Sequence, residues 1–248
     1  MFVYEKKLQY PVKIKNPNPR LAAAIISQYG GPDGELGASL RYLSQRYSMP
    51  YPELKGLLTD IGTEELGHLE MVGTIVHQLT RNLTEEQIKE AGFEPYFVDH
   101  TTGVFPQFAS GYPWSASTMQ VTGDTIADLT EDLAAEQKAR VTYDNILRLS
   151  DDPDVSDVIK FLRAREIVHF QRFGEGLRLA KDRLDEKNVY YVNPSFDQQN
   201  RKMKGSLCRL AETSFLWRDT AMRIRERFNP RAPCGARPGA SGSITCAR

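Results

Sequence analysis

One apolar stripe in this 248-residue chain is interrupted near its middle by two polar residues. Between residues 52 and 80, apolar side chains recur at alternating steps of four and three, which places them on one face of a single long helix. The positions are Leu54, Leu58, Ile61, Glu65, His68, Val72, Ile75 and Leu79. Glu65 and His68 therefore point into the core, where an unpaired carboxylate costs several kcal/mol. The couple is either a satisfied structural network or part of a ligand set for a cation.

The same interruption occurs again in the second half of the chain. Glu166 and His169, also three residues apart, lie in the middle of another apolar stripe. Its positions are Val155, Ile159, Leu162, Glu166, His169, Phe173, Gly176 and Ala180. Each couple follows a further glutamate at an equal distance, because 30 residues separate Glu35 from Glu65 and Glu136 from Glu166. Two copies of one pattern favour a site shared by both halves over chance.

The periodicity predicts an all-α fold built on a four-helix bundle. The expected helices span about residues 19–29, 33–47, 52–80, 125–149 and 155–184. In the second of these, Leu36, Leu40 and Leu43 form the expected apolar side. In the fourth, the expected inward face is Ile126, Leu129, Leu133, Glu136, Arg140, Tyr143 and Leu147.

Two other segments complete the expected main domain. Residues 1–17 are rich in Lys, Pro and Asn, and we expect an N-terminal arm that packs on the surface or on a neighbouring subunit. Residues 81–122 lack a helical period and accumulate aromatic residues, Pro and Gly. This pattern predicts a long irregular crossover between the second and third bundle helices. The bundle itself is expected to occupy residues 18–197.

Two helical pairs facing each other place four carboxylates and two imidazoles in the bundle interior. This donor set is typical of proteins that bind two metal ions in a four-helix bundle core. Two divalent ions about 3.5 to 4 Å apart repel strongly, and bridging carboxylates neutralise them at that distance. Imidazoles add neutral nitrogen donors that suit manganese and iron alike. The sequence therefore predicts a dinuclear metal site, with iron as the alternative to manganese.

Other polar residues near the stripes receive plainer interpretations. Tyr42 lies seven residues after Glu35 on the same helix face, where it either donates to a ligand carboxylate or fills the core. His77 lies off the stripe and His100 lies in the crossover, so we read both as ordinary residues. We expect three further glutamates to be solvated or capping charges: Glu64, Glu70 and Glu131.

The last 51 residues differ in composition from the rest. Residues 198–248 carry a net charge of +8, against −8 for residues 1–197, and contain all three cysteines. Neither a disulfide nor a thiolate metal site can therefore belong to the main domain. The basic tail is either an arm that docks on the acidic domain or on a polyanion, or a disordered or non-native extension, and we favour the extension.

At the motif residues the chain resembles the manganese catalases, and among them the short CotJC-type spore coat proteins. The matching stretches are Gly34 to Leu43, Asp60 to Met71, Pro113-Trp114, Thr122 to Asp124, Leu133 to Glu136 and Arg165 to His169. The resemblance spans about residues 10–197 and includes the ligand types, their order and the glycines between them.

The resemblance implies a ferritin-like bundle that holds two manganese ions per chain and disproportionates hydrogen peroxide to water and dioxygen. It implies a ligand set in which Glu35 and His68 hold one ion, Glu136 and His169 hold the other, and Glu65 bridges them. Glu166 corresponds to an outer-sphere carboxylate that moves protons, a general acid/base rather than a ligand.

The resemblance also raises alternatives about the biological role. Full-length relatives carry a further C-terminal segment that wraps neighbouring subunits in a hexamer, whereas this chain departs from the pattern after Asp197. A structural coat-assembly protein with little catalase activity is therefore the competing interpretation, and a di-iron oxidase or iron-handling protein is a third.

The expected partners and location follow from the same observations. We expect hydrogen peroxide as substrate, a homo-oligomer that is a hexamer by resemblance, and coat proteins as further partners. We expect neither a nucleic acid nor a membrane partner. No run of 18 apolar residues or signal-peptide pattern is visible, so we expect an intracellular protein, in the cytoplasm or the spore coat.

Overall fold

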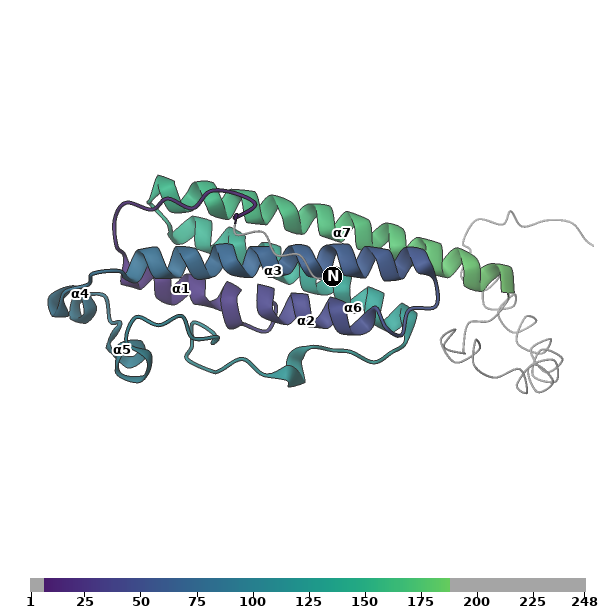
Figure 1. The fold of residues 1–248 in the computed structure, drawn as a ribbon, viewed down its shortest axis with the longest axis horizontal. Coiled ribbons are helices and arrows are strands. Elements are labelled where there is room, and N and C mark those ends of the chain that lie inside the picture. The colour runs from purple at the N-terminus through teal and green to yellow at the C-terminus, as the bar shows by residue number, and fades with distance from the viewer. Residues whose placement is uncertain (1–6, 188–248) are drawn as a thin grey trace, which may run out of the picture. The chain divides into compact units, whose positions relative to one another are not determined.

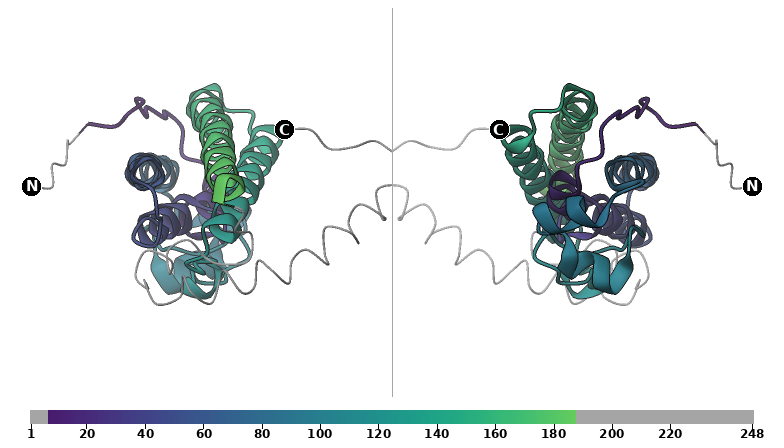
Figure 2. Two further views of the ribbon diagram at one scale, coloured as in Figure 1. Left: turned by 90° about the vertical axis from the view of Figure 1, so that its right-hand side faces the viewer. Right: turned by 90° about the vertical axis from the view of Figure 1, so that its left-hand side faces the viewer.

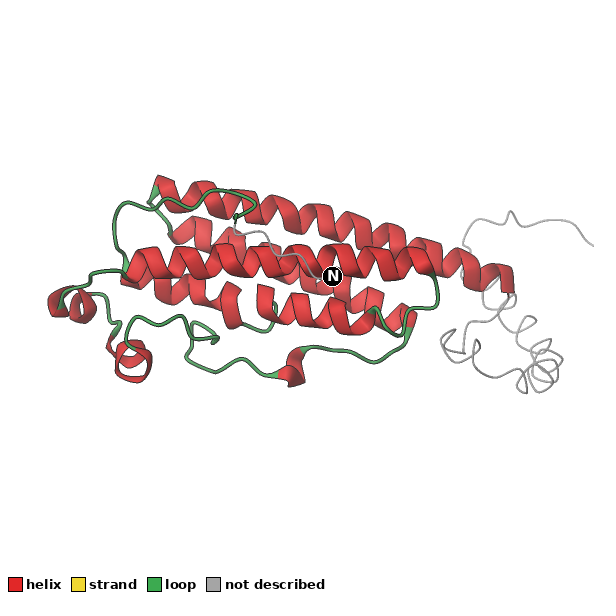
Figure 3. Cartoon of the chain, viewed as in Figure 1, coloured by secondary structure: helices red, strands yellow, loops and turns green. Residues whose placement is uncertain are grey.

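Four long helical segments run side by side in the computed structural model, which describes residues 7–187 (Figure 1). The basic tail, its cysteines and the first six residues lie outside the described residues. The helices are α1 (Pro19–Gly30), α2 (Glu35–Gln45), α3 (Pro52–Thr80), α4 (Glu85–Glu90), α5 (Glu94–His100), the 3₁₀ turn η1 (Ala116–Thr118), α6 (Thr125–Leu149) and α7 (Pro153–Lys187). Within 7–187 no strand is present, only one isolated bridge between Gln107 and Pro113 (Figure 3).

The bundle consists of two helical pairs, as the internal repeat predicts. End-on views show α6 and α7 as one pair, with α3 and the α1–α2 segment as the other (Figure 2). The first bundle helix is broken between α1 and α2, where a Cβ on Gly31 would lie 2.3 Å from the Ser27 carbonyl oxygen. Side chains cap two of the helix starts, since Asn18 accepts a hydrogen bond from the Leu21 amide and Asp124 accepts from the Ile126 and Ala127 amides. The predicted four-helix bundle is confirmed.

The core is divided into two apolar clusters along the length of the bundle. On α3, one cluster takes the residues from Met71 to Leu79, and the other takes Leu54, Leu58 and Ile61. Glu65 and His68 lie between these two groups, in the middle of the helix. Polar side chains thus occupy the level of the bundle at which the two apolar clusters meet.

The predicted apolar face of α2 is wrong, and the predicted inward face of α6 is only partly right. On α2, Leu36, Leu40 and Leu43 are only half-buried, whereas Arg41 and Gln45 are fully buried. On α6, Leu129, Glu136 and Tyr143 are buried as expected. The other four expected residues are half-buried, and Asp128 and Asp132 are buried as well. In both helices the buried face contains charged groups, which an apolar stripe cannot detect.

The crossover contains more helix than predicted. Residues 81–122 include α4 and α5, and α4 begins with a reciprocal capping box between Thr84 and Gln87. The segment then runs beside α1 and α2 toward the start of α6 (Figure 1). The fully buried Arg41 of α2 holds the end of the crossover on the bundle, because its guanidinium donates hydrogen bonds to the carbonyl oxygens of Met119 at 2.7 Å and Thr118 at 3.1 Å.

The described part of the N-terminal arm packs on the bundle of its own chain. Gln78 on α3 accepts from the Ile14 amide at 2.7 Å and donates to the Val12 carbonyl at 3.0 Å. Tyr10 stacks on Phe161 of α7 with ring centroids 4.7 Å apart. The arm therefore reaches across from α3 to α7.

Candidate metal centre

Four glutamates and two histidines from four helices converge at the middle of the bundle. They are Glu35 on α2, Glu65 and His68 on α3, Glu136 on α6, and Glu166 and His169 on α7. All six are at most 2% exposed. Every residue that the sequence proposes as a metal ligand or as the general acid/base is therefore brought to one place.

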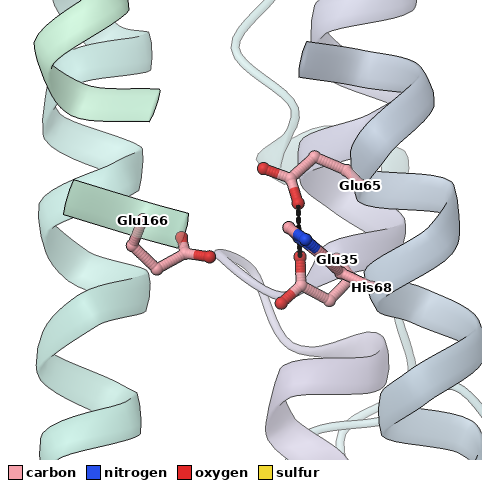
Figure 4. A group of neighbouring side chains, drawn as sticks. All are labelled: Glu35, Glu65, His68 and Glu166. Carbon is pink, nitrogen blue, oxygen red and sulfur yellow. Dashed lines mark hydrogen bonds and ion pairs between the residues drawn. The ribbon is translucent and has the colours of Figure 1, made fainter. Parts of the chain in front are cut away.

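The six residues form two overlapping groups that could each hold a metal ion. Glu35, Glu65, His68 and Glu166 offer ligand atoms within 4.8 Å of one another. Glu65, Glu136, Glu166 and His169 do the same. Figure 4 shows the first group, with Glu166 reaching from α7 toward the side chains of α2 and α3. Glu65 and Glu166 are common to both groups.

The Glu65 carboxylate lies between the two histidines. Its Oε2 is 2.6 Å from His68 Nδ1, and its Oε1 is 2.8 Å from His169 Nδ1. His169 Nδ1 is also 3.6 Å from Glu136 Oε2, and His68 Nδ1 is 4.0 Å from Glu35 Oε2. Both imidazoles therefore direct the same ring nitrogen toward the carboxylates.

Unpaired buried atoms test whether the residues fit a metal. Buried polar atoms normally have hydrogen-bond partners. Here Glu65 Oε1, Glu136 Oε2, Glu166 Oε1 and His169 Nδ1 make no hydrogen bond, although His169 Nδ1 forms ion pairs with Glu65 Oε1 at 2.8 Å and with Glu136 Oε2 at 3.6 Å. All four are donor atoms of the kinds that manganese and iron bind. The residues fit a cation, which would bind the atoms of Glu65, Glu136 and His169 that now make no hydrogen bond.

The charges in the cluster are set by burial and by mutual contact. Burial, with the charges of nearby carboxylates, raises the pKa values of Glu35 and Glu166 well above the usual range. Burial alone would raise the pKa of Glu65 too, but the charges of His169 and His68 hold it below its usual value. Burial would lower the pKa of His68, yet Glu65 and Glu64 raise it to about 10. Without a metal, protons thus supply the positive charge that the carboxylates require.

Two tyrosines bind the outer glutamates in a crossed arrangement. Tyr42 on α2 donates to Glu136 Oε1 on α6 at 2.5 Å, and Tyr143 on α6 donates to Glu35 Oε1 on α2. Of the two readings of Tyr42, the structure shows the hydrogen bond. Sequence reasoning treated Tyr143 only as a core residue, although it follows Glu136 by seven positions, as Tyr42 follows Glu35.

The expectation that Glu64 is a solvated or capping charge is wrong. Its side chain is only 16% exposed and contacts both histidines, with His169 Nε2 at 3.1 Å and His68 Nε2 at 3.6 Å. Arg165 pairs with it through Nε at 2.7 Å and Nη2 at 3.1 Å. The sequence contains a pattern that could have indicated this ion pair, since Glu64 and Arg165 each directly precede the glutamate of a Glu/His couple.

The other polar residues behave as predicted. His77 and Glu70 are exposed, and Glu131 pairs with Lys138 at 3.2 Å. His100 stacks on Phe105 with ring centroids 4.0 Å apart. None of the four belongs to the candidate metal groups.

A further buried carboxyl lies one turn before Glu136. Asp132 is fully buried, and neither of its oxygens has a hydrogen-bond partner. Burial raises its pKa well above the usual range, while Gln45 and Arg41 oppose the rise. Asp132 therefore extends the polar interior along α6 beyond the metal groups.

Comparison with known proteins shows the family of this chain. A family model described as manganese containing catalase matches residues 1–226. The chain belongs to the manganese-containing catalase family. The matched range includes part of the basic tail, which lies outside the described residues.

Individual relatives support membership in this catalase family. Protein CotJC of Bacillus subtilis is 54% identical over 190 residues, which cover 77% of this chain and 100% of that protein. A probable manganese catalase of Clostridium acetobutylicum is 37% identical over 190 residues, which cover 76% of this chain and 84% of that protein. The crystal structure of KatB, a manganese catalase from Anabaena, aligns with a TM-score of 0.69 at 35% identity, covering 73% of this chain and 81% of that one. The ferritin-like fold and the use of manganese both follow from the family.

Proposed function

We propose that the chain holds two manganese ions in the bundle and disproportionates hydrogen peroxide to water and dioxygen. The observation that carries this proposal is the convergence of buried carboxylate and imidazole groups, in which donor atoms of Glu65, Glu136 and His169 make no hydrogen bond. Family membership supplies manganese and hydrogen peroxide. Bound manganese supplies the change of oxidation state by which one peroxide molecule is reduced to water and a second is oxidised to dioxygen.

The two overlapping groups support a division of the ligands. Glu35 and His68 would hold one ion, and Glu136 and His169 the other. Glu65 would bridge the two ions, because its oxygens face one histidine each. The crossed hydrogen bonds from the tyrosines orient the two outer carboxylates.

Glu166 is the proposed general acid/base. The reaction takes two protons from the peroxide that becomes dioxygen and delivers them to the peroxide that becomes water. A carboxyl that exchanges protons near neutral pH needs a raised pKa, and burial with neighbouring charge gives Glu166 one. Its Oε1 has no hydrogen-bond partner and is therefore free to take up or release a proton.

Metal analysis and an oxygen-evolution assay on peroxide test this function. Wild type should contain two manganese ions per chain and release oxygen, whereas Glu65→Ala and His169→Ala should lose both. His77→Ala removes an exposed imidazole from α3 and serves as the matched control. Glu166→Gln should keep manganese and lose turnover. Iron in place of manganese, or wild type without metal, would contradict the proposal.

A second candidate is a structural role in the spore coat. It is favoured by the 54% identity to Protein CotJC over the whole of that protein. We propose that the chain forms a homo-oligomer and assembles with coat proteins, with or without strong catalase activity. Detection in an outer spore layer with negligible turnover would favour this role over the enzyme. Among the described helices, none is both long and apolar enough to cross a membrane.

A further inference from the structure

Two residues adjacent in the sequence lie on opposite edges of the histidine pair. The rings of His68 and His169 are nearly parallel, with centroids 5.6 Å apart and 25° between their planes. Their Nδ1 atoms face Glu65, as Figure 4 shows for His68. Their Nε2 atoms face Glu64, at 3.1 Å from His169 and 3.6 Å from His68. The histidines are thus held from the side away from the metal groups.

Gln9 of the N-terminal arm bridges the longer of these two gaps. Its Oε1 lies 3.0 Å from His68 Nε2, and its Nε2 donates to Glu64 Oε1 at 2.8 Å. An amide oxygen only accepts hydrogen bonds, so His68 keeps a proton on Nε2, and Nδ1, which faces Glu65, is the nitrogen that would bind a metal once its own proton is displaced. His169 directs its Nε2 toward the Glu64 carboxylate, which likewise holds a proton on that nitrogen.

Both oxygens of Glu64 are fully used. Arg165 forms a bidentate ion pair with them, with Nε at 2.7 Å from Oε1 and Nη2 at 3.1 Å from Oε2. Gln9 Nε2 donates to Oε1, and His169 Nε2 lies 3.1 Å from Oε2, while His68 is linked to Glu64 through Gln9. An amide in place of this carboxylate would turn one acceptor into a donor that faces other donors.

We propose that Glu64 and Gln9 are positioning residues that fix the histidines as Nδ1 ligands, Glu64 acting on both and Gln9 on His68. The inference deepens the proposed manganese site and rests on it. Hydrogen-bond partners behind metal ligands set ring orientation and tautomer, and their loss lowers metal affinity by about 10- to 100-fold. Because the contacts are unequal, the two variants should differ: loss of Glu64 affects both ions, and loss of Gln9 affects the ion held by His68.

The test compares Glu64→Gln, Gln9→Leu and the control Glu70→Gln. The control removes the same charge from an exposed position on α3. Mn²⁺ is titrated into metal-free protein by calorimetry, and electron paramagnetic resonance separates single ions from coupled pairs. Glu64→Gln should weaken both binding steps by about 10- to 100-fold. Gln9→Leu should weaken one step and favour singly occupied protein, and Glu70→Gln should bind as wild type does.

A purely structural salt bridge gives a different result. In that case Glu64→Gln and Arg165→Gln lower the melting temperature of metal-free protein equally, with Mn²⁺ affinity within about threefold of the Glu70→Gln control. That outcome overturns the inference while wild type still binds manganese. Wild type that binds none overturns the proposed function as well. Should Glu64→Gln not fold, Gln9→Leu decides, because Gln9 lies outside the bundle helices.

Discussion

Tyr143→Phe removes one hydroxyl from the interior and leaves the ring in place. In the wild type this hydroxyl donates to Glu35, and the bond lowers the pKa of a carboxyl that burial raises. Phe retains the packing of a residue that is fully buried. The change therefore isolates one hydrogen bond to one proposed ligand.

The expected loss of stability follows from the burial of both partners. A buried hydrogen bond to a carboxylate contributes about 1.5 to 3 kcal/mol, and its loss leaves Glu35 Oε1 without this donor. For a domain of this size, each kcal/mol lowers the melting temperature by about 2 to 4 °C. A fall of about 4 to 8 °C is therefore expected for a loss of about 2 kcal/mol.

Manganese affinity should fall as well. Glu35 must be ionised to hold a metal, and without the Tyr143 hydroxyl its pKa rises further, so metal competes less well with the proton. Thermal melting of metal-free protein and Mn²⁺ titration measure the two effects. Tyr96→Phe is the control, because its hydroxyl bonds the Gly103 carbonyl and the Phe105 amide away from the cluster. It should lower stability and leave Mn²⁺ affinity unchanged.

The result that would refute this reasoning is a Tyr143→Phe variant that binds Mn²⁺ as tightly as the Tyr96→Phe control. Such a result would show that the crossed tyrosines stabilise the bundle without orienting its carboxylates. Tyr42→Phe should behave like Tyr143→Phe, because its hydroxyl donates to the equivalent Glu136.

Three further predictions concern pH, packing and the tail. Metal-free protein should lose stability as the pH rises from 6.5 toward about 10, because His68 has a folded-state pKa of about 10 and an ordinary pKa of 6.5. The melting temperature of manganese-bound protein should vary less over this range. A metal-free melting temperature that does not change with pH would contradict the charge assigned to His68. Gly30→Ala should destabilise the protein by about 1 to 3 kcal/mol, since its Cβ would lie 2.3 Å from the Gln107 backbone nitrogen. Gly56→Ala, which has open space around it in α3, should stabilise the protein by about 0.5 to 1 kcal/mol. Denaturant titrations measure both changes. Removal of residues 198–248 should leave helix content and manganese content unchanged by circular dichroism and metal analysis, and loss of metal would show that the tail belongs to the site.

The long helices and the six-residue cluster could be predicted from the sequence because both depend on local spacing. All eight positions of the α3 stripe are buried, including Glu65 and His68. The buried faces of α2 and α6 were harder to predict, because Arg41 and Asp132 occupy positions that a search for apolar residues assigns to the surface. Glu64 was misjudged for a related reason: it is a charged residue outside the stripe positions, and its spacing of four residues from His68, which brings the two side chains together, was not weighed.

The sequence by itself determined which residues could form a metal site, since helical periodicity aligns each Glu/His couple on a buried face and the internal repeat pairs the two halves. Only the tertiary structure decided what supports those residues. The contacts of Glu64 with Arg165, of Gln9 with His68 and of Tyr143 with Glu35 join segments far apart in the chain. No local period encodes such contacts, because they depend on how the arm and the two helical pairs pack together in three dimensions.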